Sequence, residues 1–181
     1  MLRTLLLFIA LLPVFAKAQE ASINWMTIEE AQEAQKKNPK KIMMDVYTKW
    51  CGPCKMLDAR TFHNPDVVKY VNENYYAVKF DAEHPAAIQF KGQTFSNPNY
   101  VPGKTGRNGV HELSRHLGVG AYPTIIFLDE DLNLIAPITG FKSAQQLELY
   151  LKFFYSNEYK NVKTREEWQA YQEAFKPEFS E

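Results

Sequence analysis

The motif Trp50-Cys51-Gly52-Pro53-Cys54 constrains this chain most, because it contains the only two cysteines. It follows a short apolar run rich in strand-forming side chains and precedes a segment typical of a helix. Two thiols at this spacing can close a small disulfide and reopen it, and so exchange an electron pair with a partner's disulfide. The motif therefore predicts a redox site at a strand-to-helix junction.

Bulk composition limits the size and the partners of the protein. The 181 residues are 45% hydrophobic and 14% aromatic, which is enough for one buried core and too little for two ordinary domains. Basic and acidic residues balance at 21 each, so no polybasic surface indicates nucleic acid. We expect one α/β domain over residues 19–181 that binds no nucleic acid.

Zinc binding is an alternative use of a Cys-x-x-Cys pair. A zinc site takes about four ligands, so the pair would need to recruit histidines from among His63, His84, His111 and His116. None of them lies at finger-like spacing. An inert thiol pair is the other alternative. We expect no metal and no cofactor beyond a redox-active Cys51–Cys54 disulfide.

The N-terminus is typical of an export signal. Arg3 is its positive residue, an apolar run spans residues 5–15, and Ala16-Lys17-Ala18 has the small-x-small pattern that signal peptidase cuts. The run is roughly a dozen residues, whereas a membrane-spanning helix needs about 20, so a permanent anchor is the less favoured alternative. We predict a signal peptide at residues 1–18, no membrane span after cleavage, and a periplasmic or secreted protein.

Local sequence patterns predict alternating strands and helices. Side chains able to cap a helix start occur at Thr27, Asn64, Ser143 and Thr164. Strands are expected at residues 42–47, 75–80, 123–128 and 132–139, a helix at 108–117, and an extra C-terminal helix at about 164–175. The order predicts an α/β fold in which helices flank a central mixed β-sheet.

One irregular stretch, at about residues 84–109, interrupts the alternation. Glycine, proline and asparagine surround an alternating centre at residues 88–95, which predicts a small hairpin or edge strand. Loops of this length in compact domains are usually functional or disordered. We therefore treat the stretch as a candidate for partner recognition, with disorder as the alternative.

The position of the motif predicts different roles for its two thiols. Cys51 would lie at a helix N-terminus, where free N–H groups and the helix dipole stabilise a thiolate. Cys54, one turn into the helix, is expected to be more buried. Cys51 is thus the predicted nucleophile, and Cys54 is predicted to resolve the mixed disulfide that Cys51 forms.

Asp45 is the one charged residue in the apolar run at residues 42–47. Burial would raise its pKa, because desolvation disfavours the carboxylate. The carboxylate could then accept the Cys54 proton through water. An exposed strand-end aspartate without a role is the alternative.

The other motif residues are predicted to form the substrate side of the site. Gly52 leaves little bulk over Cys51, and Pro53 restrains the turn between the cysteines. Trp50 either packs in the core or forms a flat apolar wall beside the site.

The run Asp45-Val46-Tyr47-Thr48-Lys49 and the motif that follows it closely resemble the thioredoxin family. Ala121-Tyr122-Pro123-Thr124 is similar to the family's cis-proline segment, and Gly140 to its late glycine. The resemblance covers about residues 42–154. It implies a thioredoxin-like fold with an insertion at about 84–109, before the cis-proline strand, and an extra C-terminal helix.

The resemblance also implies roles for three further residues. Pro123 would be cis and lie against the cysteines, which would bring the Tyr122 backbone beside Cys51 to pair with an extended substrate. An ordinary trans proline is the alternative. Lys79 resembles the family lysine that lies near the buried aspartate, where it would moderate the charge on Asp45. A plain surface lysine is the alternative.

The activity implied is that of a thiol:disulfide oxidoreductase, and Gly52-Pro53 is more similar to reducing members of the family than to oxidising or isomerising ones. The segment from Cys54 to residue 67 is similar to exported relatives, including the C-terminal domain of DsbD-type reductases. Expected partners are disulfide-containing proteins and an electron donor, either a membrane thiol transporter or another reductase. A disulfide isomerase or oxidase, and a redox-regulated client-binding module, stay open as alternatives.

Overall fold

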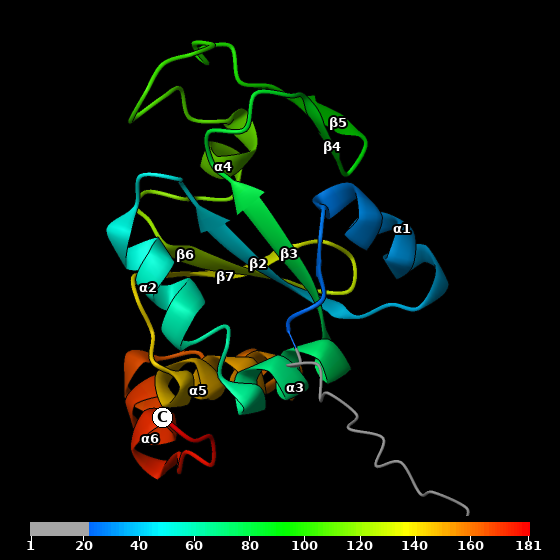
Figure 1. The fold of residues 1–181 in the computed structure, drawn as a ribbon. Helices are drawn as coiled ribbons and strands as arrows, with labels where there is room; N and C mark the ends of the chain where they lie inside the picture. Colours follow the sequence, from blue (N-terminus) through cyan, green and yellow to red (C-terminus); the bar gives the residue numbers. More distant parts are fainter. Residues whose placement is uncertain (1–21) are drawn as a thin grey trace, which may run out of the picture.

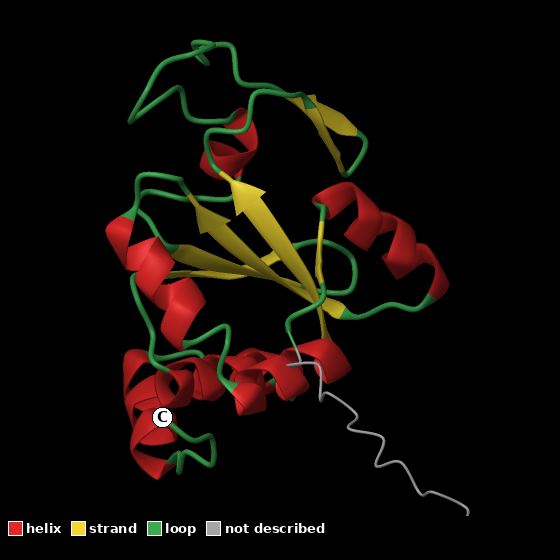
Figure 2. Ribbon diagram, in the orientation of Figure 1, coloured by secondary structure: helices red, strands yellow, loops and turns green. Residues whose placement is uncertain are grey.

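The computed structural model describes residues 22–181 and contains a five-stranded mixed sheet with helices on both faces (Figures 1 and 2). The strand order is β1-β3-β2-β6-β7, in which β3 is parallel to β1 and β2, while β6 is antiparallel to β2 and β7. The strands are β1 (Trp25–Met26), β2 (Lys41–Tyr47), β3 (Tyr75–Asp81), β6 (Thr124–Leu128) and β7 (Leu134–Thr139). The predicted fold class is confirmed. The signal peptide predicted at 1–18 lies outside the described residues.

Helices cover the two faces of the sheet unequally. One face packs against α1 (Ile28–Lys37), α4 (Glu112–His116) and a separate hairpin of β4 (Ile88–Phe90) and β5 (Gln93–Phe95). The other face packs against α2 (Gly52–Arg60), α3 (Pro65–Asn74) and α5 (Ala144–Tyr155). A short 3-10 turn (Glu158–Lys160) and α6 (Arg165–Ala174) follow, and aromatic contacts join α6 to the outer side of α5.

The predicted caps start the helices where expected. Capping boxes, in which the cap side chain and the third helical residue satisfy each other's backbone N–H groups, form at Thr27, Ser143 and Thr164. Asn64 Oδ1 accepts the N–H groups of Asp66 and Val67 at 2.9 and 3.2 Å. Local chemistry alone therefore fixes these four helix starts.

The central strand β2 is buried on both faces, and its side chains alternate between them. Ile42, Met44 and Val46 pack with α1 and α4, whereas Met43 packs with α2, α3 and α5. Because side chains of a strand alternate with a period of two, Asp45 shares the face of Met43. The only acid of the strand is thus directed toward the helix that contains the cysteines.

The prediction of a helix over residues 108–117 is wrong in its first half, because α4 begins only at Glu112. The Asn108 side chain instead accepts the Val101 N–H at 2.8 Å and donates to the Val101 carbonyl at 3.0 Å. A Cβ on Gly109 would lie 2.4 Å from the Asn99 backbone, so glycine permits this close approach. Loop contacts therefore replace the first helical turn.

The stretch at 84–109 forms the β4–β5 hairpin, which packs with α1 and α4, followed by a loop. Ile88 pairs with Phe95 in the hairpin, as the alternating pattern predicted. The Asn97 side chain joins the two ends of the stretch by donating to the carbonyls of His84 and Gly109 at 3.1 and 2.7 Å. A single side-chain amide thus closes a long loop.

A buried carboxylate fixes the C-terminal segment against α5. Glu148 is fully buried, accepts the backbone N–H groups of Glu178 and Phe179 at 2.9 to 3.0 Å, and pairs with Lys152 at 2.7 Å. Buried charge is stable only when it is paired and hydrogen-bonded in this way. The pole of the molecule opposite the 84–109 stretch is therefore closed by the chain itself (Figure 1).

Candidate active site

Cys51 caps the helix that contains Cys54. Its backbone is extended, and its Sγ accepts the Cys54 N–H at 3.1 Å, in the position of a helix N-cap. A disulfide joins the two residues. Pro53 occupies the first helical turn, where a missing N–H costs nothing. The structure thus places the motif at the predicted strand-to-helix junction, with the sulfur of Cys51 at the positive end of α2.

The expected difference in burial between the two cysteines is wrong. Cys51 is 3% exposed and Cys54 is 5% exposed. Closing the disulfide brings both sulfurs together, so the same surrounding chain covers them. They differ instead in their neighbours, because Cys54 lines a cavity beneath the motif and Cys51 does not.

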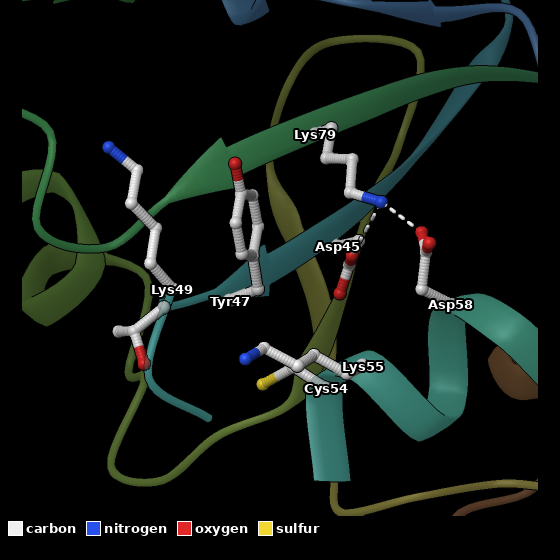
Figure 3. Close-up of a pocket in the computed structure, with 8 residues that line it drawn as sticks. Asp45, Tyr47, Lys49, Cys54, Lys55, Asp58 and Lys79 are labelled. Atoms are coloured by element: carbon white, nitrogen blue, oxygen red, sulfur yellow. Dashed lines mark hydrogen bonds and ion pairs between the residues drawn. The ribbon is translucent and has the colours of Figure 1, made fainter. Parts of the chain in front are cut away.

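The cavity beneath the motif has a volume of about 330 Å³ (Figure 3). Its lining comes from β2, the loop after it, α2 and β3, and consists of Asp45, Tyr47, Thr48, Lys49, Cys54, Lys55, Asp58 and Lys79. Most of these residues are polar or charged, unlike those of the surrounding core. The fold therefore places titratable groups in the same cavity as Cys54.

Asp45 is the most buried acid of this cavity, with 2% exposure. Its Oδ2 lies 3.9 Å from Lys79 Nζ, and its Oδ1 has no hydrogen-bond partner in the described part of the chain. Desolvation raises the pKa of Asp45 from 3.8 to about 7, Lys79 opposes the shift, and Asp58 adds to it. A carboxylate with this pKa can take up and release a proton near neutral pH.

Lys79 lies opposite Asp45 because the two residues are register partners in the parallel pair β2–β3. Its ammonium group forms a second ion pair with Asp58 of α2, and it lies 5.1 and 5.5 Å from the ring centres of Trp25 and Tyr47. Figure 3 shows the lysine between the two carboxylates. Lys79 thus lies next to Asp45, as predicted, and also pairs with Asp58.

Asp58 is a site residue that the sequence analysis missed. It lies four residues after Cys54 on α2, so the two share one helix face. This four-residue spacing from Cys54 is the sequence feature that could have identified Asp58. Its significance depends on β3 lying opposite that face, which local sequence does not indicate.

We expect Asp58→Asn to lower the pKa of Asp45. The substitution removes a negative charge that raises this pKa and leaves Lys79 with Asp45 as its remaining carboxylate partner. NMR titration of the Asp45 side chain measures the change directly. Asp131→Asn, at an exposed turn, is the matched control. An unchanged or higher Asp45 pKa in Asp58→Asn would show that the Lys79 arrangement does not set it.

Trp50 is held from three sides at the surface of the site. Its Nε1 donates to Glu83 Oε1 at 2.8 Å, the Arg107 guanidinium lies 4.7 Å from the ring centre, and the Tyr122 ring makes an edge contact at 5.9 Å. The ring is partly buried. Glu83 and Arg107 are further neighbours that the sequence analysis missed, because they meet Trp50 only in the folded chain.

The segment around Pro123 adjoins the motif through this aromatic contact. The Tyr122–Pro123 peptide is cis, and the Pro123 carbonyl accepts the Gly140 N–H at 2.8 Å. On the other side, a Cβ built on Gly52 would meet no atom within 4 Å apart from its chain neighbours and its own helix backbone, so the space above this residue is open. The chain surface at Gly52 is therefore uncovered next to the Tyr122–Pro123 segment.

Within residues 22–181, no three acidic, histidine or cysteine side chains cluster as a metal site would require. Over the same residues, no helix has both the length and the apolar character needed to cross a bilayer.

A family model described as a thioredoxin-like domain matches residues 28–155. The chain belongs to the thioredoxin-like domain family. The matched residues include both cysteines of the Cys51–Cys54 disulfide. The match ends with α5, so α6 lies outside the part that defines the family.

Individual thioredoxin-like relatives agree with this assignment. The thiol:disulfide interchange protein DsbD of Pectobacterium atrosepticum is 26% identical over 129 residues, which are 70% of this chain and 18% of that protein. The chain thus spans less than a fifth of the curated relatives it matches.

Solved structures show the same fold. A candidate disulphide-isomerase of Bacteroides thetaiotaomicron is 26% identical, with a TM-score of 0.52, over 75% of this chain and 95% of that chain. A thioredoxin of Thermus thermophilus is 16% identical, with a TM-score of 0.55, over 74% of this chain and 87% of that chain.

Proposed function

We propose that the protein reduces disulfides of exported proteins. The Cys51 thiolate attacks one sulfur of a client disulfide, which forms a mixed disulfide and releases the other client sulfur as a thiolate. Cys54 then attacks the Cys51 sulfur, so the client leaves as a dithiol and the Cys51–Cys54 disulfide forms. The client gains the electron pair that the protein loses, and the disulfide is the only redox group that the reaction needs.

The observation that carries this proposal is that Cys54 and the buried Asp45 line one cavity. Cys54 must lose a proton before it can attack, because the thiolate is the nucleophile. Asp45 has a pKa of about 7 and an unpartnered oxygen within the described structure, so it is suited to accept that proton, directly or through water. Cys51 at the start of α2 needs no such base, since N–H groups and the helix dipole favour its thiolate.

The substrate side of the site is proposed to be Trp50, Gly52, Pro53 and the Tyr122–Pro123 segment. The open space above Gly52 admits a client chain, and the Tyr122 backbone would pair with it as an added strand. Trp50 would form the flat wall next to this chain. Lys79 would act on the reaction only through the pKa of Asp45.

Export requires a continuing supply of electrons. We propose that the N-terminal signal directs the protein to the periplasm or outside the cell, where conditions are oxidising. A reductase there must be returned to its dithiol form, and a membrane thiol transporter or another reductase would do this. The similarity to one part of the thiol:disulfide interchange protein DsbD supports exchange with such a donor.

The reduction potential tests the proposed direction. We expect equilibration with glutathione to give a value closer to the roughly −270 mV of thioredoxin than to the roughly −120 mV of the oxidant DsbA. Quantifying the reduced fraction by thiol alkylation and mass spectrometry gives the potential. A value near that of DsbA would rule out a reductase and favour an oxidase.

An isomerase is the second candidate, because the structural relative from Bacteroides thetaiotaomicron is described as a candidate disulphide-isomerase. An isomerase would restore activity to a scrambled disulfide protein without consuming reductant in proportion. A reductase would consume one equivalent of dithiol for each disulfide opened. Measuring both quantities in one reaction separates the two candidates.

A further inference from the structure

The far end of the 84–109 stretch returns to the redox motif. Glu83, which is 9% exposed, accepts both the Trp50 Nε1–H and the Asn108 backbone N–H at 2.8 Å. The Arg107 guanidinium stacks over the Trp50 ring, 4.7 Å from its centre. One buried carboxylate therefore positions the motif tryptophan and the loop relative to each other.

A groove of about 270 Å³ opens between this loop and the motif. Its lining is formed by Lys49, Trp50, Asp81, Glu83, Tyr100, Lys104, Gly106 and Asn108. Two aromatic side chains thus supply apolar surface, one from the motif and one from the loop. Because Trp50 directly precedes Cys51, a chain bound in the groove would continue toward the reactive sulfur.

The two acids of the groove already have partners. Asp81 Oδ2 lies 3.6 Å from Lys49 Nζ, and Asp81 Oδ1 accepts the Glu83 N–H at 3.0 Å. Glu83 accepts the two N–H groups described above. On the loop side, Lys104 and Arg107 are exposed, and neither forms an ion pair with any residue in the described range. Asp81 and Glu83 keep their negative charges but are largely covered, whereas Lys49, Lys104 and Arg107 are exposed, so the charge that the groove presents to solvent is mainly positive.

We propose that this groove binds an acidic segment of the client next to the client's disulfide. This inference rests on the proposed oxidoreductase function and names the client chemistry that it selects. Client carboxylates would lie against Lys104 and Arg107, while the peptide backbone runs along the groove that Trp50 and Tyr100 line. Exposed charges of this kind act mainly on encounter and on the choice of partner.

Disulfide-bonded peptides that differ only in the residues flanking one cysteine test the proposal. We expect kcat/KM for a glutamate-flanked peptide to exceed that for a lysine-flanked peptide by about tenfold at low ionic strength. A serine-flanked peptide should lie between them. The preference should shrink as salt is added, because the charges are exposed.

Variants of the loop test which residues cause the preference for the glutamate-flanked peptide. The double variant Lys104→Gln and Arg107→Gln should bring the ratio of kcat/KM for the glutamate-flanked peptide to that for the lysine-flanked peptide to about one. Lys104→Gln alone, which leaves the stacking of Arg107 on Trp50 intact, should lower this ratio to about threefold. Lys176→Gln is the control, because this exposed lysine follows α6 at the opposite pole. A wild-type ratio near one, or a ratio that the double variant retains, overturns the acidic-client proposal alone. If the wild type reduced none of the three peptides, the proposed reductase function would fail with it.

Discussion

Replacement of Cys51 by serine is expected to abolish turnover, whereas replacement of Cys54 by serine is expected to trap clients. Without Cys51 no mixed disulfide can form, so reduction of insulin by dithiothreitol should fall to the uncatalysed rate. Without Cys54 the mixed disulfide forms at Cys51 but has no internal thiol to resolve it. Non-reducing electrophoresis and mass spectrometry of the Cys54→Ser adducts would identify the clients.

The paired variants also separate an enzyme from a client-binding module. Cys51→Ser keeps the shape of the site, because serine and cysteine differ little in size. Thr61→Ser is a matched control at a buried position at the C-terminal end of the same helix. A binding module would hold clients equally well in the wild type, Cys51→Ser and Thr61→Ser, and it would show no thiol-dependent turnover. Retained turnover in Cys51→Ser would contradict the assignment of the nucleophile.

Replacement of Asp45 by asparagine is expected to slow client release by roughly a hundredfold to ten-thousandfold at neutral pH, the scale on which general bases contribute. In the wild type, the release rate should rise as pH passes through about 7, where Asp45 becomes a carboxylate. In Asp45→Asn this rise should be absent, and the release rate should depend on pH only through the ionisation of the thiols. Stopped-flow measurement of mixed-disulfide resolution across pH 5 to 9 would record the difference.

The same substitution is expected to stabilise the fold at alkaline pH. The folded pKa of Asp45 is about 7 and the unfolded value is 3.8, so between these values the folded state binds a proton that the unfolded state has released. The free energy of unfolding of the wild type therefore falls as pH rises from about 4 to about 7, by up to about 4 kcal/mol, and levels off above. The free energy of unfolding of Asp45→Asn should not fall in this way, because asparagine does not titrate.

Urea denaturation at pH 4 and pH 8 measures this effect. The two proteins should have similar stabilities at pH 4, and the variant should be the more stable one at pH 8. A variant that is less stable at both values would show that Asp45 supports the fold in its charged form. The expected combination of slower release and higher stability would instead mark Asp45 as a residue kept for its chemistry.

Sequence alone predicted the parts of the fold that depend on local chemistry. The helix starts at Thr27, Asn64, Ser143 and Thr164 follow from side chains that satisfy nearby N–H groups. The strands follow from apolar runs that must be buried, and Asp45 stood out because it interrupts one of them. The resemblance to the thioredoxin family then ordered these elements in space.

Contacts between distant segments set the features that sequence did not predict. Asp58, Glu83 and Arg107 are ordinary surface-type residues in the sequence, and they matter only because folding brings them to Lys79 and Trp50. The helix expected from residue 108 is shortened by contacts of the loop with itself. The burial of Cys51 reflects the closed disulfide, which residue spacing does not report.

The separation of β4 and β5 from the main sheet has a consequence for local stability. The hairpin pairs only with itself, whereas β2 is bonded to strands on both sides. Amide protons of β2 should therefore exchange with solvent only on global unfolding, while those of the hairpin and the following loop exchange through smaller openings. If the groove selects clients as proposed, electron transfer and client choice would belong to different cooperative units. We then expect substitutions in the loop to change the client range while the reduction potential stays as it is.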